Sequence, residues 1–164
     1  MRGLEAKVVH SDICFAAAGV YWHGPRMADV KYTLLLVDKD PVDLDTLARR
    51  LRRRGFDVLS QSTGEEALRT IAFEKVDLVI LDFSTPERDG MQVLRRLRSQ
   101  TRSARLPVIL IVAATEKGEA SGVLAALDQG ANDYVSKPID IDVLMASIRT
   151  FLPNSPEIAS LSGT

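Results

Sequence analysis

The stretch DLVILD, residues 77–82, decides the fold: four apolar residues lie between two aspartates. A run this short and this apolar is typical of a strand that is buried on both faces, as in a parallel sheet. Two similar runs flank it in the sequence, TLLLVD at residues 33–38 and PVILIV at residues 107–112. Together the three runs predict the centre of a parallel sheet that is covered by helices on both faces.

The segments between these strands have the periodicity of amphipathic helices. Asp40 and Pro41 begin the first helix, as its N-cap and first-turn residue, and Gly55 ends it. The remaining predicted elements are helices after Thr63, Asp89 and Asp140 and at residues 116–128, and strands at residues 56–60 and 133–136. Five strands alternating with five helices predict a doubly wound α/β fold with right-handed crossovers.

The chain has the size and composition of one globular domain. Its 164 residues carry a net charge of −1, which gives no general attraction to nucleic acid or to an anionic membrane. Five arginines between residues 49 and 54 are interpreted as the solvated side of a helix. The single cysteine, Cys14, cannot form an internal disulfide and fits a reducing cytosol, and no apolar run is long enough to span a membrane. We therefore expect a cytoplasmic protein.

The domain is expected to occupy residues 30–152. Residues 1–29 are interpreted as a poorly ordered N-terminal extension, because Met27 lies just before the first convincing strand. Residues 153–164 begin with PNSP and are interpreted as a C-terminal tail or the stub of a linker.

Three polar residues end predicted strands: Asp38 the first, Asp82 the third and Lys137 the fifth. The carboxyl ends of parallel strands meet at one edge, so these side chains are expected to lie together. Two facing carboxylates need a cation between them, and Mg²⁺ is the usual one beside phosphate. A lysine opposite them suits the oxygens of an anion. The arrangement predicts phosphoryl transfer to Asp82 as nucleophile, although a lone aspartate at a strand end is more often a helix cap.

Four motifs resemble those of response-regulator receiver domains, in order and at fitting spacing: LLLVD at 34–38, LVILD at 78–82, PERDG at 86–90 and GANDYVSKP at 130–138. The resemblance covers about residues 32–152. It implies a flavodoxin-like, five-stranded parallel sheet in the order 2-1-3-4-5 with five helices. It also implies slow self-phosphorylation and dephosphorylation chemistry rather than the turnover of an enzyme.

The resemblance also implies roles for individual residues. Asp82 would be the phosphoacceptor, Lys137 would contact the phosphoryl group after a cis bond to Pro138, and Tyr134 would be an aromatic switch. The ligands of Mg²⁺ would be Asp38, Asp82 and the backbone carbonyl of Ser84.

One position departs from the family pattern at the metal site. Receivers usually have two adjacent acids after the first strand, and here Lys39 holds the second position. Asp40 is a possible replacement ligand, although its role as N-cap competes. Replacing a carboxylate by an ammonium reverses the sign of its interaction with a divalent ion. In a sharper hypothesis Lys39 takes the place of the metal and pairs with Asp82; in a milder one it points to solvent and Mg²⁺ binds weakly.

A second departure concerns the Ser or Thr that usually ends the fourth strand and bonds the phosphoryl group. Counting forward from Pro107 reaches Val112, which has no hydroxyl, whereas counting backward from Lys137 reaches Thr115. The two counts differ because residues are inserted between these points. A strand of fixed length favours Val112, and Thr115 remains the alternative.

Signalling is expected to pass through protein contacts. The resemblance implies a histidine kinase or a phosphotransfer protein as phosphodonor and a downstream protein effector, with no nucleic-acid or membrane partner. The chain would be a monomer, or a weak dimer through the last helix–strand–helix face around Tyr134. One rival reading is a degenerate receiver that acts as a phosphorylation-independent adaptor. A cofactor binder on the same architecture is disfavoured, because the acidic loop at residues 38–41 lacks a phosphate cradle.

Overall fold

The structure is a computed structural model that describes residues 15–16, 19–20, 31–83, 89–113, 119–153 and 155. The chain divides into two units, residues 1–30 and residues 31–164. In the first unit, strands β1 (Phe15–Ala16) and β2 (Gly19–Val20) pair in antiparallel orientation. The rest of the expected extension, and most of the expected tail at 153–164, lies outside the described residues.

The second unit contains the predicted five-stranded parallel sheet. Its order is β4-β3-β5-β6-β7, which is the expected order 2-1-3-4-5 when these strands are numbered among themselves. The strands are β3 (Thr33–Val37), β4 (Asp57–Gln61), β5 (Leu78–Asp82), β6 (Val108–Val112) and β7 (Asp133–Ser136). The most apolar strands, β3, β5 and β6, lie at the centre, as their composition predicts.

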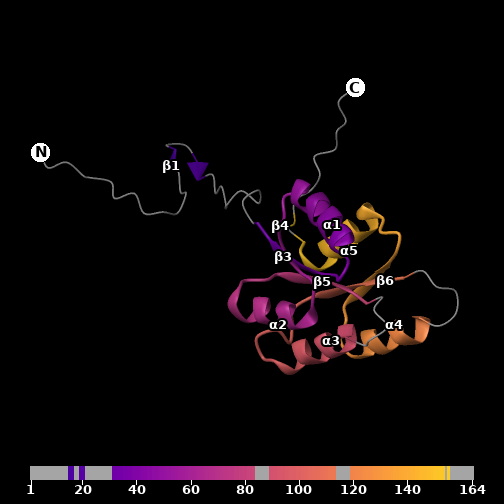
Figure 1. The fold of residues 1–164 in the computed structure, drawn as a ribbon. Helices are drawn as coiled ribbons and strands as arrows, with labels where there is room; N and C mark the ends of the chain where they lie inside the picture. Colours follow the sequence, from indigo (N-terminus) through magenta and orange to yellow (C-terminus); the bar gives the residue numbers. More distant parts are fainter. Residues whose placement is uncertain are drawn as a thin grey trace, which may run out of the picture. The chain divides into compact units, whose positions relative to one another are not determined.

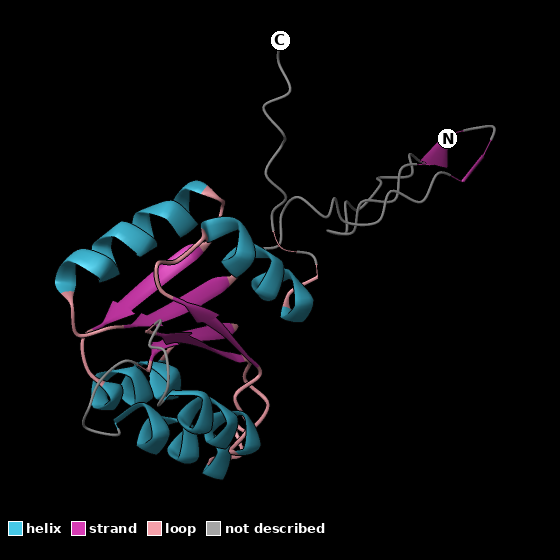
Figure 2. Cartoon of the chain, turned by 90° about the vertical axis from the view of Figure 1, so that its right-hand side faces the viewer, coloured by secondary structure: helices cyan, strands magenta, loops and turns pink. Residues whose placement is uncertain are grey.

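Helices cover both faces of this sheet (Figures 1 and 2). On one face lie α1 (Pro41–Arg53) and α5 (Ile141–Phe151), and on the other lie α2 (Gly64–Phe73), α3 (Asp89–Ser99) and α4 (Glu119–Asp128). Successive strand residues point to opposite faces, so Leu34 and Leu36 of β3 enter the core beneath α1 and α5, whereas Leu35 enters the core on the other side. The sheet therefore separates two hydrophobic cores.

Predicted helix caps are present and fix the first turns beside the sheet. The carboxylate of Asp40 accepts hydrogen bonds from the backbone N–H groups of Val42 and Asp43, at 2.8 and 3.2 Å. Asp140 caps α5 in the same way, and Thr63 accepts from the N–H of Glu66 in α2. The N-cap at Asp40 holds the start of α1 close to the carboxyl end of β3.

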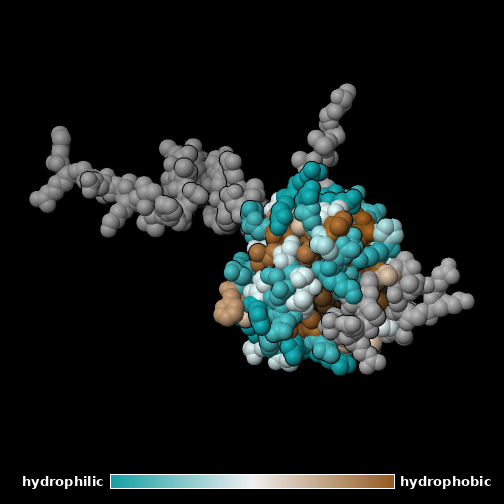
Figure 3. Space-filling model, in the orientation of Figure 1, coloured by the Kyte–Doolittle hydropathy of each residue, from teal (hydrophilic) through white to brown (hydrophobic). Residues whose placement is uncertain are grey.

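The arginine-rich side of α1 makes structural contacts. Arg49 pairs with Asp45 one turn away, Arg52 donates to the backbone carbonyl of Val58, and Arg54 pairs with Asp142 of α5 at 3.1 Å. The face in Figure 3 is largely hydrophilic, with smaller hydrophobic areas between. These contacts support the interpretation of the arginine run as a solvated helix side.

None of the helices in the described part of the chain has the length and hydrophobicity of a transmembrane span.

One arginine binds together the loops that precede β6 and β7. From the last turn of α3, the guanidinium of Arg98 donates twice to the carbonyl of Gly130, at 2.7 and 2.9 Å. It also donates to the carbonyls of Ser103 and Leu106 and to the side-chain oxygen of Asn132. Burial lowers the pKa of Arg98, but a guanidinium remains charged and keeps all of these donors.

Replacing Arg98 by methionine should therefore destabilise the domain. The side chain keeps much of its apolar length, but several carbonyl oxygens lose their donor, which should lower the free energy of unfolding by about 2–3 kcal/mol. Urea denaturation followed by circular dichroism measures this loss. The matched control is Arg96→Met in the same helix, where the exposed side chain should change stability by no more than about 0.5 kcal/mol. Similar values for both variants would contradict the role of Arg98.

Candidate functional site

Four charged side chains meet at the carboxyl edge of the sheet. Asp38 directly follows β3, Asp82 is the last residue of β5, and Lys137 directly follows β7. The backbone N–H of Lys137 donates to the carbonyl of Val112 at 2.7 Å, which ties the lysine to the end of β6. Its bond to Pro138 is cis, as expected from the sequence. The fourth side chain, Asp43, comes from the first turn of α1.

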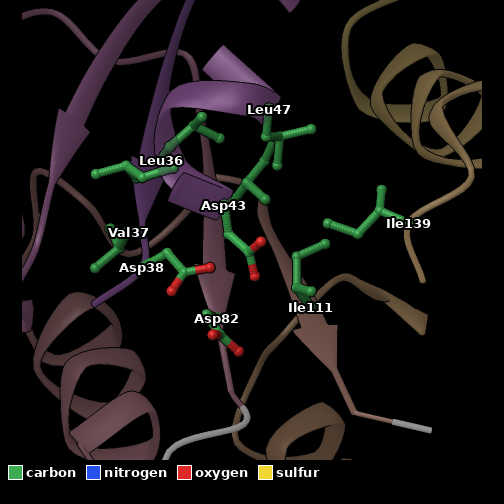
Figure 4. A pocket seen from close by; sticks show the side chains of 10 residues that line it. Leu36, Val37, Asp38, Asp43, Leu47, Asp82, Ile111 and Ile139 are labelled. Atoms are coloured by element: carbon green, nitrogen blue, oxygen red, sulfur yellow. The ribbon is translucent and has the colours of Figure 1, made fainter. Parts of the chain in front are cut away.

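The ammonium of Lys137 lies among three carboxylates. Its Nζ is 3.2 Å from Oδ2 of Asp82, 3.2 Å from Oδ2 of Asp43 and 3.7 Å from Oδ2 of Asp38. Figure 4 shows these three aspartates among the residues that line a small pocket, together with apolar side chains such as Ile111. The structure therefore brings together the three strand-end residues that the sequence predicted, and it adds Asp43.

Burial differs sharply across the site. The side chain of Asp82 is 7% exposed and that of Asp38 is 14% exposed, whereas Lys137 and Asp43 are 27% and 53% exposed. Asp82 thus lies at the bottom, and Asp43 lies at the rim beside solvent.

The electrostatics follow from this crowding. Burial raises the pKa of Asp38, and the negative charge of Asp82 raises it further, although the N–H of Asp40 and the ammonium of Lys137 act in the opposite direction. Burial alone would lower the pKa of Lys137, but the charges of its three carboxylate neighbours outweigh burial and raise it. The lysine therefore keeps its charge, and a cation beside Asp38 and Asp82 would offset the burial and repulsion that raise the pKa of Asp38.

The donor set partly fits a divalent cation. Asp38 and Asp82 provide two adjacent hard oxygen ligands of the kind that Mg²⁺ takes, and their mutual repulsion would be relieved by such an ion. Within the described ranges, no cluster of three or more acidic, histidine or cysteine side chains has the arrangement of a metal site. Ser84, whose carbonyl is an expected ligand, lies outside the described residues.

Lys39 does not form the ion pair that the sharper hypothesis expected. Its side chain is exposed, and among the described residues it has no ion pair, because Lys137 already occupies the place beside Asp82. Lys39 nevertheless lines a surface pocket together with Asp38 and Asp82. Asp40 is exposed, and its carboxylate caps α1, which confirms the competing role foreseen from the sequence.

The other expected residues lie around this centre. Val112 is the last residue of β6, opposite Ser136 of β7, and its side chain is buried in the core. The strand geometry places Val112 at the strand end, whereas Thr115 lies outside the described residues, so the choice between them stays a prediction. Tyr134 lies on the edge strand β7 and is 48% exposed.

Sequence reasoning missed Asp43. A usable signal was present: Asp40 at the N-cap places Asp43 at the third helical position, in the turn nearest the edge of the sheet. An acid at this position is normally explained by its interaction with the helix dipole, so its sequence context did not assign Asp43 to the site.

Comparison with known proteins identifies the family to which this chain is similar. A family model of the response regulator receiver domain matches residues 34–149. The chain is 38% identical over 128 residues to the transcriptional regulatory protein KdpE of Mycobacterium tuberculosis, which covers 78% of this chain and 54% of KdpE.

Two solved structures share the fold. A putative response regulator from Chloroflexus aurantiacus has a TM-score of 0.69 and 31% identity and covers 76% of this chain and 99% of its own. The receiver domain of the sensor histidine kinase PA1611 from Pseudomonas aeruginosa, which holds a magnesium ion in its active-site cleft, has a TM-score of 0.67 and 27% identity, with coverages of 76% and 99%.

This chain belongs to the response regulator receiver domain family of two-component signalling systems. It spans about half the length of curated relatives such as KdpE and the regulator PhoP of Bacillus subtilis.

The raised pKa of Asp38 predicts a pH-dependent gain in stability for Asp38→Asn. An acid whose pKa is higher in the folded than in the unfolded state stabilises the fold most below its ordinary value of 3.8, and this contribution falls as the pH rises through the folded pKa. Asparagine cannot ionise, so the variant should be more stable than wild type at about pH 7, and the difference should shrink toward about pH 4. Urea denaturation with a chelator present measures the stability of the variant and of wild type at each pH. An equal difference at the two pH values would contradict the prediction, and Asp57→Asn, at an exposed aspartate away from the site, is the control.

Proposed function

We propose that this receiver accepts a phosphoryl group on Asp82 and signals to a protein partner through the resulting change in charge. The observation that carries the proposal is the 3.2 Å contact between Lys137 Nζ and Oδ2 of Asp82, at the bottom of a site open to solvent. A buried carboxylate beside a protonated lysine is a nucleophile whose product charge already has a counter-charge in place.

The transfer is a displacement at phosphorus. An oxygen of Asp82 forms a bond to phosphorus while the bond between phosphorus and the donor breaks, and the electron pair of that bond leaves with the donor. The donor is a phosphohistidine of a histidine kinase or phosphotransfer protein, or acetyl phosphate in a test tube. Lys137 stabilises the oxygens of the phosphoryl group during the transfer, so its role is electrostatic.

A divalent cation would be held by Asp38 and Asp82, with the carbonyl of Ser84 as a further expected ligand. Mg²⁺, when bound, would supply neutralisation of negative charge on the phosphoryl oxygens. One oxygen of Asp38 accepts a hydrogen bond of 2.9 Å from the N–H of Asp40, and this bond orients the carboxylate of Asp38. The positive charge of Lys39 in the adjoining pocket opposes the cation and should make its binding weak.

The new negative charge would be read at the face formed by α4, β7 and α5. Tyr134 lies on β7, three residues before Lys137, and is half-exposed, so a change in its packing would alter the surface of this face. Val112 offers no hydroxyl at the end of β6, so coupling between the phosphoryl group and the ring would depend on Thr115 or on Lys137 itself. A downstream protein that binds this face would sense the difference.

Incubation with acetyl phosphate and Mg²⁺ tests the acceptor role. Intact-protein mass spectrometry should show the gain of one phosphoryl group, and peptide mapping should place it on Asp82. Asp82→Asn should abolish the gain, whereas Asp57→Asn, at an exposed acid of β4 that pairs with Lys31, should leave it unchanged. A wild-type protein that gains no mass would contradict the proposal and favour a phosphorylation-independent adaptor.

Lys39→Asp should strengthen Mg²⁺ binding. The substitution replaces a positive by a negative charge beside the two carboxylates, and a tenfold gain in affinity corresponds to only about 1.4 kcal/mol. Isothermal titration of Mg²⁺ should therefore show a dissociation constant lower by about tenfold or more. Lys75→Asp makes the same charge change next to Asp77, away from the site, and should have little effect. Equal affinities for wild type and Lys39→Asp would rule out an influence of Lys39 on the metal.

A further inference from the structure

The contact between Asp43 and Lys137 has no role in the chemistry proposed above. Asp43 Oδ2 accepts a hydrogen bond from Lys137 Nζ at 3.2 Å, the same distance that separates Nζ from Asp82. The two aspartates come from different elements, α1 and β5, and 94 residues separate Asp43 from Lys137 in the sequence. The lysine is thus held from both sides.

The backbone fixes Asp43 in this place. Its own N–H donates to the carboxylate of Asp40, the N-cap of α1, at 3.2 Å. The following residues of α1, Leu44 and Leu47, pack against the core beneath that helix. Asp43 therefore presents its carboxylate from a fixed first turn, although the carboxylate itself is 53% exposed.

The ammonium of Lys137 has three N–H donors, which the neighbouring carboxylates share. Two are directed to Asp43 and Asp82, and Asp38 lies farther away, at 3.7 Å. Among the described residues, hydrogen bonds from Nζ go to Asp43 and Asp82, so the third N–H can be directed to an oxygen of an arriving phosphoryl group. A lysine side chain loses rotamer entropy when it is fixed, and a second anchor meets part of that cost before the donor arrives.

We propose that Asp43 is a positioning residue, which anchors the ammonium of Lys137 at the mouth of the site and thereby speeds phosphoryl transfer to Asp82. This inference rests on the proposed acceptor function. Asp43 does not touch the reacting atoms; it acts through Lys137. Because Asp43 is 53% exposed and Asp82 is 7% exposed, the ammonium is held between a carboxylate beside solvent and a buried one.

The alternative is that Asp43 serves only the helix. An acid in the first turn interacts favourably with the N-terminal dipole of α1, and its loss could alter the site through the fold. The two roles differ in one respect: anchoring requires Lys137, whereas a dipole effect does not.

A double-mutant cycle separates them. The initial rate of Asp82 phosphorylation by acetyl phosphate is measured for wild type, Asp43→Asn, Lys137→Met and the double variant, all at saturating Mg²⁺. Asp43→Asn should slow wild type by about two- to fivefold, as expected for an exposed ion pair, and should have no effect in the Lys137→Met background. Asp43→Glu should restore part of the rate, and Asp45→Asn, the same charge change at an exposed acid of α1 that pairs with Arg49, should leave it unchanged.

A second measurement does not depend on phosphorylation. NMR relaxation of the lysine side chains should show lower order at the end of Lys137 in Asp43→Asn than in wild type or in Asp45→Asn. Equal slowing by Asp43→Asn in both backgrounds, a faster rate, or unchanged order of Lys137 would overturn the inference. If wild type takes no phosphoryl group at all, the acceptor function fails, and the NMR comparison alone then decides whether Asp43 anchors the lysine.

Discussion

A single ammonium surrounded by carboxylates organises the functional edge of this domain. Lys137 lies within 4 Å of Asp38, Asp43 and Asp82, and these residues come from the ends of three neighbouring parts of the fold. Like charges at such distances repel in a partly buried place, and the protonated lysine offsets this repulsion. The proposed metal binding, the proposed phosphoryl transfer to Asp82 and the proposed role of Asp43 all depend on this positive charge.

The parallel sheet makes this arrangement possible. Parallel strands align their carboxyl ends, so acids at the ends of β3 and β5 and a base after β7 must meet regardless of the loops between them. This is why the parallel sheet, its helix layers and the meeting of Asp38, Asp82 and Lys137 could be predicted from apolar runs and their terminal residues, whereas the strand order was implied by the resemblance to receiver domains. The local sequence indicated which residues end each strand, and the parallel topology then limited where those residues could lie.

What could not be predicted depends on side-chain direction. Asp43 has the sequence context of a dipole-stabilising acid, and only the orientation of the first turn of α1 reveals that it reaches Lys137. Lys39 was expected in one of two places, and the choice depended on whether another cation already stood beside Asp82. The identity of the hydroxyl donor near Val112 depends on a loop whose insertion the sequence shows but whose path it does not determine.

The contacts of Arg98 and of Lys137, at opposite edges of the sheet, differ in kind. At the amino edge, Arg98 donates to carbonyl oxygens of the loops before β6 and β7, neutral acceptors whose bonds are little affected by a change in ionic conditions. At the carboxyl edge the contacts are between full charges. A change in salt concentration, an added anion or a metal should therefore affect the contacts of Lys137 at the carboxyl edge more than those of Arg98 at the amino edge.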